Sequence, residues 1–336
     1  MHHSDETAID TLRQLNRRKF MLRLAKAGGA IVAAGGLAYL FHDPKGPDAR
    51  PPQSKSAPIE LPDYSAAQAG KKMAVARGAD RAQTLNSALK ALGGIEAFIK
   101  KGDCVLLKVN AAFASPPILS ATTHPEVVRE MVKLCFQAGA SEVRVTDNSI
   151  NDPDSCFRLS GIAEATEQSG GTLFLPNQRY FKPFTLENAA LIRQWPLLYT
   201  PLHGVNKLIG IAPVKDHHRA GASMTMKNWY GLLGGRRNIF HQDINTIIAE
   251  LAMMVKPTLV ILDGTTAMMT NGPTGGATSD LKQTNTMIVS TDQVAADAFG
   301  ATLLGRQISD LPYIGKAASA GCGVSDYQSL KPIEVS

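Results

Sequence analysis

The sequence KLIGIAPVKDHHRAGASMTMKNWYGLLGGRRNIFH, residues 207–241, predicts a buried strand that leads directly into a functional loop. Its first part, residues 208–214, is a short apolar run of the kind found in buried strands. The run stops at the polar residues KDHH (215–218), and a loop is expected to begin there. The four glycines that follow the apolar run, at positions 221, 231, 234 and 235, allow tight turns or a close approach of the backbone to a ligand.

This stretch carries four ionisable side chains that we predict to be catalytic, Lys215, Lys227, His217 and His241. A lysine would hold a carboxylate or phosphate group, and a histidine would move a proton near neutral pH. Two aromatic residues and two methionines between positions 224 and 230 indicate a packed segment, so desolvation is expected to perturb the pKa values of these side chains. The alternative is an ordinary structured loop, because glycine-rich polar loops occur on many protein surfaces.

The net charge of +6 does not indicate a nucleic-acid-binding protein. Residues 1–50 contain eight Lys/Arg and five Asp/Glu, and the other residues contain 27 and 24, so half of the excess lies in the N-terminal segment. The remainder has no basic run interleaved with aromatic residues. We therefore expect no nucleic-acid partner.

The four cysteines are widely spaced and form no CxxC pair. This spacing lacks the local signature of a zinc ribbon or of an iron–sulfur cluster. Disulfides are compatible with an exported protein, but the spacing does not assign them.

The N-terminal segment, residues 1–43, resembles a twin-arginine translocation signal. Arg17 and Arg18 precede Lys19 and Phe20, and an Ala/Gly-rich apolar run covers residues 27–41. The run is shorter than the about 20 residues of a spanning helix and no A-x-A site follows, so cleavage and retention as an inner-membrane anchor both fit. We expect the twin-arginine export machinery as a partner and a periplasmic or other extracytoplasmic location. Residues 44–70 have the composition of a flexible linker.

Residues 71–336 are predicted to form a single α/β domain. Strand-like runs alternate with helical patterns, which predicts three layers, with a largely parallel or mixed sheet and helices on both faces. Strands are expected at residues 73–76, 103–109, 141–146, 172–175, 208–214, 257–262 and 286–290, and helices at 84–100, 125–138, 159–168, 243–255 and 294–304. Residues 176–206 break the alternation and are predicted to be an insertion or a cap over the site.

Five predicted strands end in charged or amide residues, at KVN (108–110), DNS (147–149), KDHH (215–218), DGT (263–265) and TD (291–292). Because parallel strands end at one edge of a sheet, these side chains are expected to line one pocket. A glycine-rich turn, NGPTGG (271–276), offers further backbone donors, although it is not a P-loop. We predict a small anionic ligand bound by Lys108, Asn110, Asn228 and Gly272. The same residue types suit a divalent metal, with His217, His241, Asp263 and Asp292 as candidate ligands.

In combination and order, several of these segments resemble the Domain of Unknown Function 362 family over about residues 73–324. The matching segments are KVN (108–110), THPEVV (123–128), GASEVRVTDNS (139–149), PVKDHHRAGASMTMKNWYGLLG (213–234), LVILDGTTAMMTNGPTGG (259–276) and STDQVAADAFGATLLG (290–305). The resemblance implies no settled reaction. Some members carry an added ferredoxin-type cysteine segment, which this chain lacks.

Two functions are compatible with the sequence. The first is an exported enzyme that acts on a small anionic substrate, with or without a metal. The second is a non-catalytic accessory protein that holds a metal or cofactor for an exported, iron–sulfur-associated redox system and has a redox partner protein. Lysine, histidine and aspartate from several strands favour the enzyme, because a simple carrier needs fewer such groups.

Overall fold

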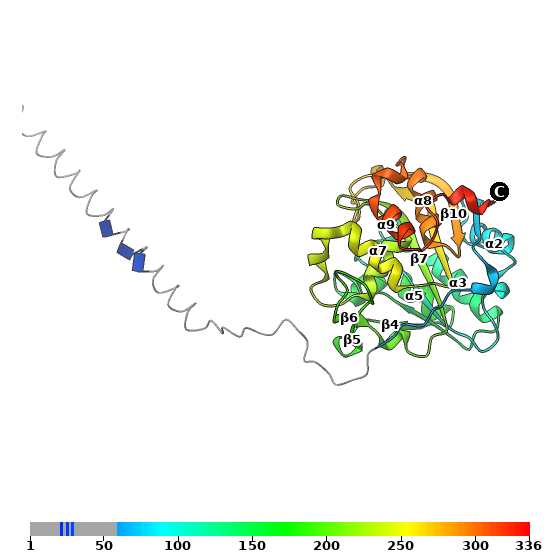
Figure 1. The fold of residues 1–336 in the computed structure, drawn as a ribbon, viewed down its shortest axis with the longest axis horizontal. Helices are drawn as coiled ribbons and strands as arrows, with labels where there is room; N and C mark the ends of the chain where they lie inside the picture. The colour runs from blue at the N-terminus through cyan, green and yellow to red at the C-terminus, as the bar shows by residue number, and fades with distance from the viewer. Residues whose placement is uncertain (1–20, 23–24, 27, 30–58) are drawn as a thin grey trace, which may run out of the picture. The chain divides into compact units, whose positions relative to one another are not determined.

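The computed structural model describes residues 21–22, 25–26, 28–29 and 59–336 (Figure 1). The predicted translocation signal and most of the predicted linker lie outside these residues, so export and anchoring stay predictions. Within the described residues, no helix combines the length and the apolar character needed to cross a bilayer. The structure places the start of the folded region before residue 71, because Tyr64 is 1% exposed and donates its backbone N–H to the Lys256 carbonyl (3.1 Å).

The sequence-based prediction of an α/β fold is confirmed by a nine-stranded mixed sheet flanked by helices. Its main path has the order β11-β1-β10-β9-β7-β2-β3-β4, and β8 pairs with β7. The strands are β1 (Met73–Arg77), β2 (Cys104–Lys108), β3 (Glu142–Thr146), β4 (Thr172–Phe174), β7 (Lys207–His217), β8 (Gly221–Ser223), β9 (Leu259–Met268), β10 (Leu281–Ser290) and β11 (Ile333–Val335). Except for β8 and β10, the strands run in one direction.

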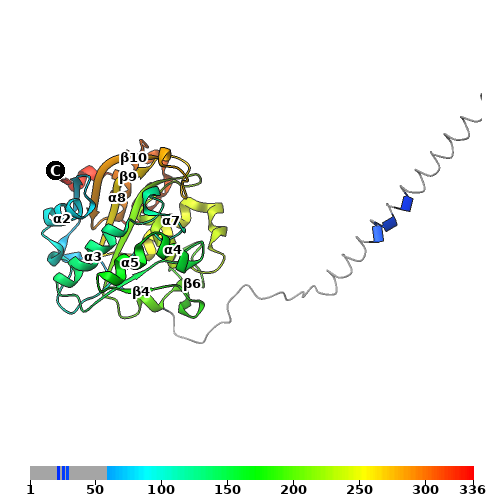
Figure 2. The same ribbon diagram turned by 180° about the vertical axis from the view of Figure 1, so that it is seen from behind.

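Helices cover both faces of the sheet, as Figures 1 and 2 show from opposite sides. One face packs against α2 (Arg81–Ala91), α3 (Pro125–Gln137) and α5 (Ile162–Gln168), which α4 (Pro153–Leu159) precedes. The other face packs against α6 (Thr225–Asn228), α7 (Ile244–Met254), α8 (Gln293–Leu303) and α9 (Pro312–Ser319). Two apolar cores result, because side chains alternate between the faces: Ile209 and Ile211 of β7 belong to one core, and Leu208 and Ala212 to the other.

The position of β10 corrects one of the expectations about the strand ends. This strand is antiparallel to β9, and its last residue, Ser290, pairs with Val260 near the start of β9. Thr291 and Asp292 therefore lie at the opposite edge of the sheet from the ends of β7 and β9. The sequence pattern contains no information about strand direction, and this is why the error arose.

The strands β7 and β9 are longer than expected. Apolar content predicts their ends at residues 214 and 262, whereas they continue to His217 and Met268. The polar residues stay in the ladder because pairing continues: Lys215 pairs with Ser223 of β8 and with Met268 of β9. Side chains that were expected in a loop are thus held by a sheet.

The segment predicted to be an insertion forms a separate two-stranded sheet of β5 (Phe181–Phe184) and β6 (Trp195–Leu198). It packs against the residues that follow α6, since the Trp195 and Phe240 ring centroids are 4.4 Å apart. The carboxylate of Glu250 in α7 accepts backbone N–H groups from residues 190, 191 and 192, at 2.6 to 3.1 Å. These contacts hold the segment against α7 and the residues that follow α6, and its description as an insertion or a cap stays a prediction.

Candidate functional site

The candidate site lies where β7 continues past its shorter neighbour. The last residue of β2, Lys108, pairs with Gly210, so residues 211–217 of β7 extend beyond the end of β2. Lys215 and His217 are two residues apart and share one face of this extension. We call Lys215, Lys227, His217, His218 and His241 the cationic cluster.

Lys215 is almost fully buried, with 1% of its surface exposed. Its Nζ donates to the Ala121 carbonyl and to Asn110 Oδ1 (3.3 Å), and lies 5.3 Å from the centroid of the Phe113 ring. No carboxylate forms an ion pair with it in the described part of the chain. Desolvation, and secondly the charge of Lys227, lower the pKa of Lys215 to about 7.

A buried polar network lies next to Lys215 and is linked to it through Asn110. Lys108 Nζ donates to the Val109 carbonyl (2.7 Å) and to both the carbonyl and the Oδ1 of Asn228 (2.7 and 3.0 Å), and it forms an ion pair with Asp147 (2.8 Å). Asn110 Nδ2 also donates to Asn228 Oδ1, at 3.4 Å. Burial lowers the pKa of Lys108, and the Asp147 charge acts in the opposite direction.

This network assigns a supporting role to two residues that were predicted to bind substrate. The polar atoms of Lys108 are occupied by protein groups, and Asn228 Nδ2 donates to the Lys108 and Ile211 carbonyls (3.1 and 3.2 Å). Asn110 is the link to the cluster, because its Oδ1 accepts from Lys215. Lys108 and Asn228 position Asn110 and Lys215 and have no free donor for a ligand.

Lys227 differs from both other lysines in having no fixed partner. It extends from the short helix α6 and is partly buried. In the described part of the chain its Nζ makes no hydrogen bond or ion pair, and it lies 5.2 Å from the centroid of the Tyr230 ring. Desolvation, and then the charge of Arg237, lower the pKa of Lys227 to about 7. An ammonium group next to an aromatic ring, with its donors unused, is suited to an incoming anion.

The two outer histidines are stacked on His217. The ring centroids of His217 and His218 are 5.0 Å apart with an interplanar angle of 9°, and those of His217 and His241 are 5.8 Å apart at 17°. His217 Nδ1 accepts the backbone N–H groups of Arg219 and Ala220, both at 3.2 Å. Its proton is therefore on Nε2. Desolvation and the charge of Lys227 lower the pKa of His217 to about 2, so the ring is neutral.

His241 has the opposite tautomer. The Tyr230 hydroxyl donates its one hydrogen to the Arg237 carbonyl (2.6 Å), so it can only accept from His241 Nδ1, which lies 3.3 Å away. His241 Nδ1 also lies 3.2 Å from the Asn238 carbonyl, which likewise only accepts. The proton is therefore on Nδ1, and Nε2 carries a lone pair. Burial lowers the pKa of His241 and keeps this lone pair available.

Two further polar residues, neither of them among the predicted site residues, hold this geometry. Arg237 donates to four carbonyl oxygens, those of residues 148, 149, 230 and 233, at 2.5 to 3.3 Å. Asp297 of α8 accepts the backbone N–H groups of Thr225 (2.8 Å) and Met226 (3.2 Å), and so fixes the helix that carries Lys227. The signal for Asp297 was a single acidic residue within the apolar sequence AADAF (295–299).

The family described as "Domain of unknown function (DUF362)" matches residues 105–302, which include all of these side chains. The chain belongs to the DUF362 family. The resemblance inferred from the sequence is thereby confirmed. The DUF362 chain is also similar to the thylakoid-associated protein sll1697 of Synechocystis sp. (strain ATCC 27184 / PCC 6803 / Kazusa), with 26% identity over 236 residues, 64% of this chain and 67% of the relative.

Two solved structures are more distantly similar to the DUF362 chain. One is a protein from Thermotoga maritima, with 11% identity, a TM-score of 0.37 and coverage of 71% of this chain and 58% of the other. The second is the lactate racemase apoprotein from Thermoanaerobacterium thermosaccharolyticum, with 12% identity, a TM-score of 0.39 and coverage of 75% and 60%. The chain thus spans about three fifths of the length of each structure.

The remaining predicted site residues of the DUF362 domain lie apart from the cationic cluster or have other partners. Asp263 binds the Arg81 guanidinium (3.0 Å) and the Thr265 N–H (2.8 Å). Asp292 is the N-cap of α8 at the opposite edge and pairs with Lys71 (3.2 Å). The N–H of Gly272 donates to Asp216 (3.1 Å), and the backbone of Asp216 fills the space where a side chain at position 272 would begin.

The four predicted metal ligands therefore do not come together. His217 and His241 lie side by side, but Asp263 and Asp292 are held elsewhere by cationic partners. Among the described residues, no three His, Cys, Asp or Glu side chains form a group that could hold a metal ion. The cluster itself contains positive and neutral groups without a carboxylate, a composition that favours an anion.

The two lysines predict how the stability of the DUF362 domain depends on pH. Their pKa values are lowered to about 7 in the folded state, whereas in the unfolded state they titrate near their ordinary value. Between these values the unfolded state binds more protons, so stability is expected to rise with pH. We expect the free energy of unfolding, measured with urea, to increase from pH 7 to about 8, below the ordinary pKa of thiols and phenols. A Lys215→Met/Lys227→Met variant should show a flatter dependence. A stability that falls over this window in the wild-type protein would contradict the lowered pKa values.

Proposed function

We propose that this DUF362 protein is an enzyme that acts on a small anionic substrate bound at the cationic cluster. The observation that carries the proposal is the absence, in the described part of the chain, of any carboxylate paired with Lys215 or Lys227, although both lysines are desolvated. Two such groups in one site repel each other and destabilise the free protein. A bound carboxylate or phosphate would supply the missing negative charge.

The contacts of each side chain support different roles. Among the described residues the donors of Lys227 are free, so this residue would bind the anionic group directly. Lys215 is held by Asn110 and Ala121 and would add positive charge next to the bound anion. The neutral His217 would donate a hydrogen bond from Nε2 to an oxygen of the substrate. His241, with its lone pair on Nε2, would accept a proton as a general base.

The sequence-based alternative, a non-catalytic accessory protein that holds a metal or cofactor, has a different site composition. Metal centres in proteins are built from several histidine, cysteine or carboxylate ligands. No such group of three is present among the described residues, and the cluster is cationic. We therefore favour the enzyme and base no step on a metal.

Replacement of His241 by glutamine tests the catalytic role separately from binding. Glutamine retains a polar side chain but cannot accept and release a proton near neutral pH, so we expect turnover to fall by at least about 100-fold, the usual contribution of general acid–base catalysis. The affinity for a non-reactive anion, measured by calorimetry with oxalate, should change less than threefold by rough expectation, because the lysines are intact. The substrate for the rate measurement would come from a screen of small oxo acids and phosphate esters.

The matched control is His218→Gln, because His218 also stacks on His217 and we assign it no proton transfer. Equal losses of turnover in the two variants would argue against His241 as the base. Loss of oxalate binding in the His241 variant would indicate a binding role.

A further inference from the structure

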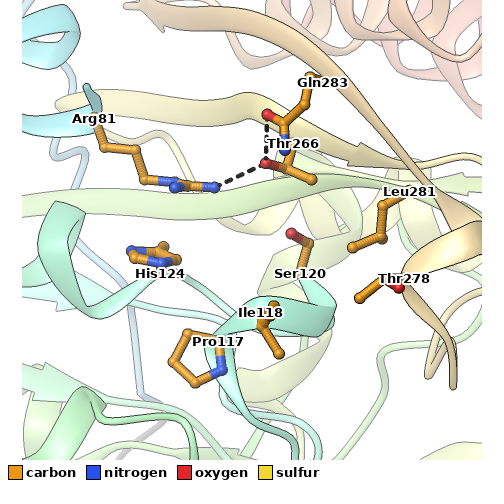
Figure 3. A pocket seen from close by; sticks show the side chains of 9 residues that line it. All are labelled: Arg81, Pro117, Ile118, Ser120, His124, Thr266, Thr278, Leu281 and Gln283. Atoms are coloured by element: carbon orange, nitrogen blue, oxygen red, sulfur yellow. Dashed lines mark hydrogen bonds between the residues drawn. The ribbon is translucent and has the colours of Figure 1, made fainter. Parts of the chain in front are cut away.

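A second cavity, with a volume of about 540 Å³, lies outside the cationic cluster. It is bounded by the start of α2, the 3-10 helix Pro117–Leu119, the start of α3 and the strands β9 and β10 (Figure 3). None of the five cluster residues lines it. Its size falls within the range of about 300–1,000 Å³ that is usual for small-molecule sites.

The guanidinium group of Arg81 is fixed in the wall of this cavity and keeps one nitrogen free. Its Nε donates to Asp263 Oδ2 (3.0 Å) and its Nη2 donates to Thr266 Oγ1 (3.2 Å). Within the described residues, Nη1 has no hydrogen-bond partner. Among the described residues, the carboxylate that pairs with Arg81 is that of Asp263, and both of its oxygens are engaged, because Oδ1 accepts the Thr265 N–H.

A hydrogen bond to Thr266 also fixes the side-chain amide of Gln283 in the cavity wall. Thr266 Oγ1 donates to Gln283 Oε1 at 3.0 Å, and Figure 3 shows the resulting chain from Arg81 through Thr266 to Gln283. The acceptor of the glutamine is thereby occupied. Its NH₂ group has no partner among the described residues, so it remains available as a donor.

On the opposite wall, His124 and Ser120 add further donors. His124 Nδ1 accepts the Glu126 backbone N–H in a long bond of 3.4 Å, which leaves the proton on Nε2. Burial, and then the charge of Arg81, lower the pKa of His124, which is consistent with a neutral ring. The Ser120 hydroxyl makes no hydrogen bond within the described residues, although Ser120 is only 6% exposed.

We propose that this cavity is a second ligand site, which binds the carboxylate of an amphipathic organic acid with a single negative charge. The free polar groups at Arg81, Gln283 and His124 are donors, while Asp263 and the Gln283 carbonyl oxygen beside them already accept hydrogen bonds within the protein. An acceptor-rich ligand group therefore complements the site. One arginine, already paired with Asp263, provides too little positive charge for a polyphosphate.

The apolar part of the lining indicates the remainder of the ligand. Pro117, Ile118 and Leu281 contribute apolar surface beside the donors. Ile118 is 68% exposed, so its side chain is accessible to an aliphatic chain in the cavity. A short alkyl chain of about four to six carbons would gain about fourfold in affinity for each CH₂ group that it buries.

Hexanoate, titrated into the full chain by calorimetry with ligand-observed NMR as a second readout, tests the proposal. We expect saturable binding at one site, and no saturation by hexanol, which lacks the carboxylate. A dissociation constant for hexanoate weaker than about 10 mM, or equal binding of hexanol, would overturn it.

Two variants locate the site. Gln283→Leu retains the size of the side chain and removes a donor, and it should weaken hexanoate binding by about tenfold. Arg81→Met combined with Asp263→Asn removes both members of the ion pair, so no buried charge is left alone, and binding should disappear while the circular dichroism spectrum is unchanged. Lys227→Met should leave hexanoate binding unchanged. If it abolishes binding instead, hexanoate occupies the cationic cluster and the second site is refuted.

Discussion

Substitution of Gly231 by alanine is expected to destabilise the protein by about 3–5 kcal/mol, because it would break a buried ion pair. A Cβ atom at this position would lie 1.7 Å from Asp147 Oδ1 and 2.7 Å from Lys108 Nζ. Neither the Asp147 carboxylate nor the Lys108 ammonium group can move away easily. Both residues are buried, and Lys108 donates hydrogen bonds to the Val109 and Asn228 carbonyls. Displacement of Asp147 would leave the Lys108 charge without its partner. The midpoint and slope of urea unfolding would measure the loss.

Gly276→Ala is the matched control. Gly276 is exposed, its backbone does not have a positive φ, and a Cβ atom there would have no neighbour within 4 Å. We expect this variant to lie within about 0.5 kcal/mol of wild type. If Gly231→Ala is equally mild, the Lys108–Asp147 pair does not pack against residue 231 as described.

Substitution of Lys227 by methionine is expected to weaken oxalate binding by about 100-fold, close to 3 kcal/mol, because it removes the ammonium group of the cationic cluster whose donors are free within the described residues. Stability should not decrease. Methionine retains the apolar contact with Tyr230, and the change removes a desolvated charge that repels Lys215. A loss of affinity without a loss of melting temperature therefore distinguishes a binding residue from a structural one.

The pH dependence of oxalate binding provides an independent check on the same residue. The lysines must be protonated to attract the anion, and their pKa values in the free protein are about 7. Affinity should therefore be highest below pH 7 and should decrease above it by up to about tenfold per pH unit for each of the two lysines, with proton uptake on binding. Lys182→Met is the control, because Lys182 also lies over a tyrosine ring, that of Tyr199 at 4.7 Å, but is exposed and outside the cluster. A similar weakening in this control would mean that oxalate responds only to net charge.

The local sequence was sufficient to predict most strands and helices, because their signals are local. The apolar run 208–214 indicated β7, and the periodic pattern near residues 125–138 indicated α3. Even so, the N-cap of α3 is His124, whose ring accepts the Glu126 N–H, and not the neighbouring Thr123, a residue type that is more common at helix N-caps. Both residue types can accept such a bond, and the choice between them depends on the fold, where Thr123 donates its hydroxyl to the Ile211 carbonyl (2.9 Å).

The sequence by itself determined the α/β class, the family and the stretch that carries Lys215, Lys227, His217 and His241, because hydrophobic periodicity and residue type are properties of the chain. Only the tertiary structure decided what each polar residue does. Because β10 is antiparallel, Asp292 lies at the far edge of the sheet. Lys108 and Asn228 bond to each other and position other site residues. Asp297 and Arg237 fix the backbone of the segment that carries Lys227 and Tyr230. The physical reason is that strand direction and the partners of a buried polar group depend on residues that are distant in sequence.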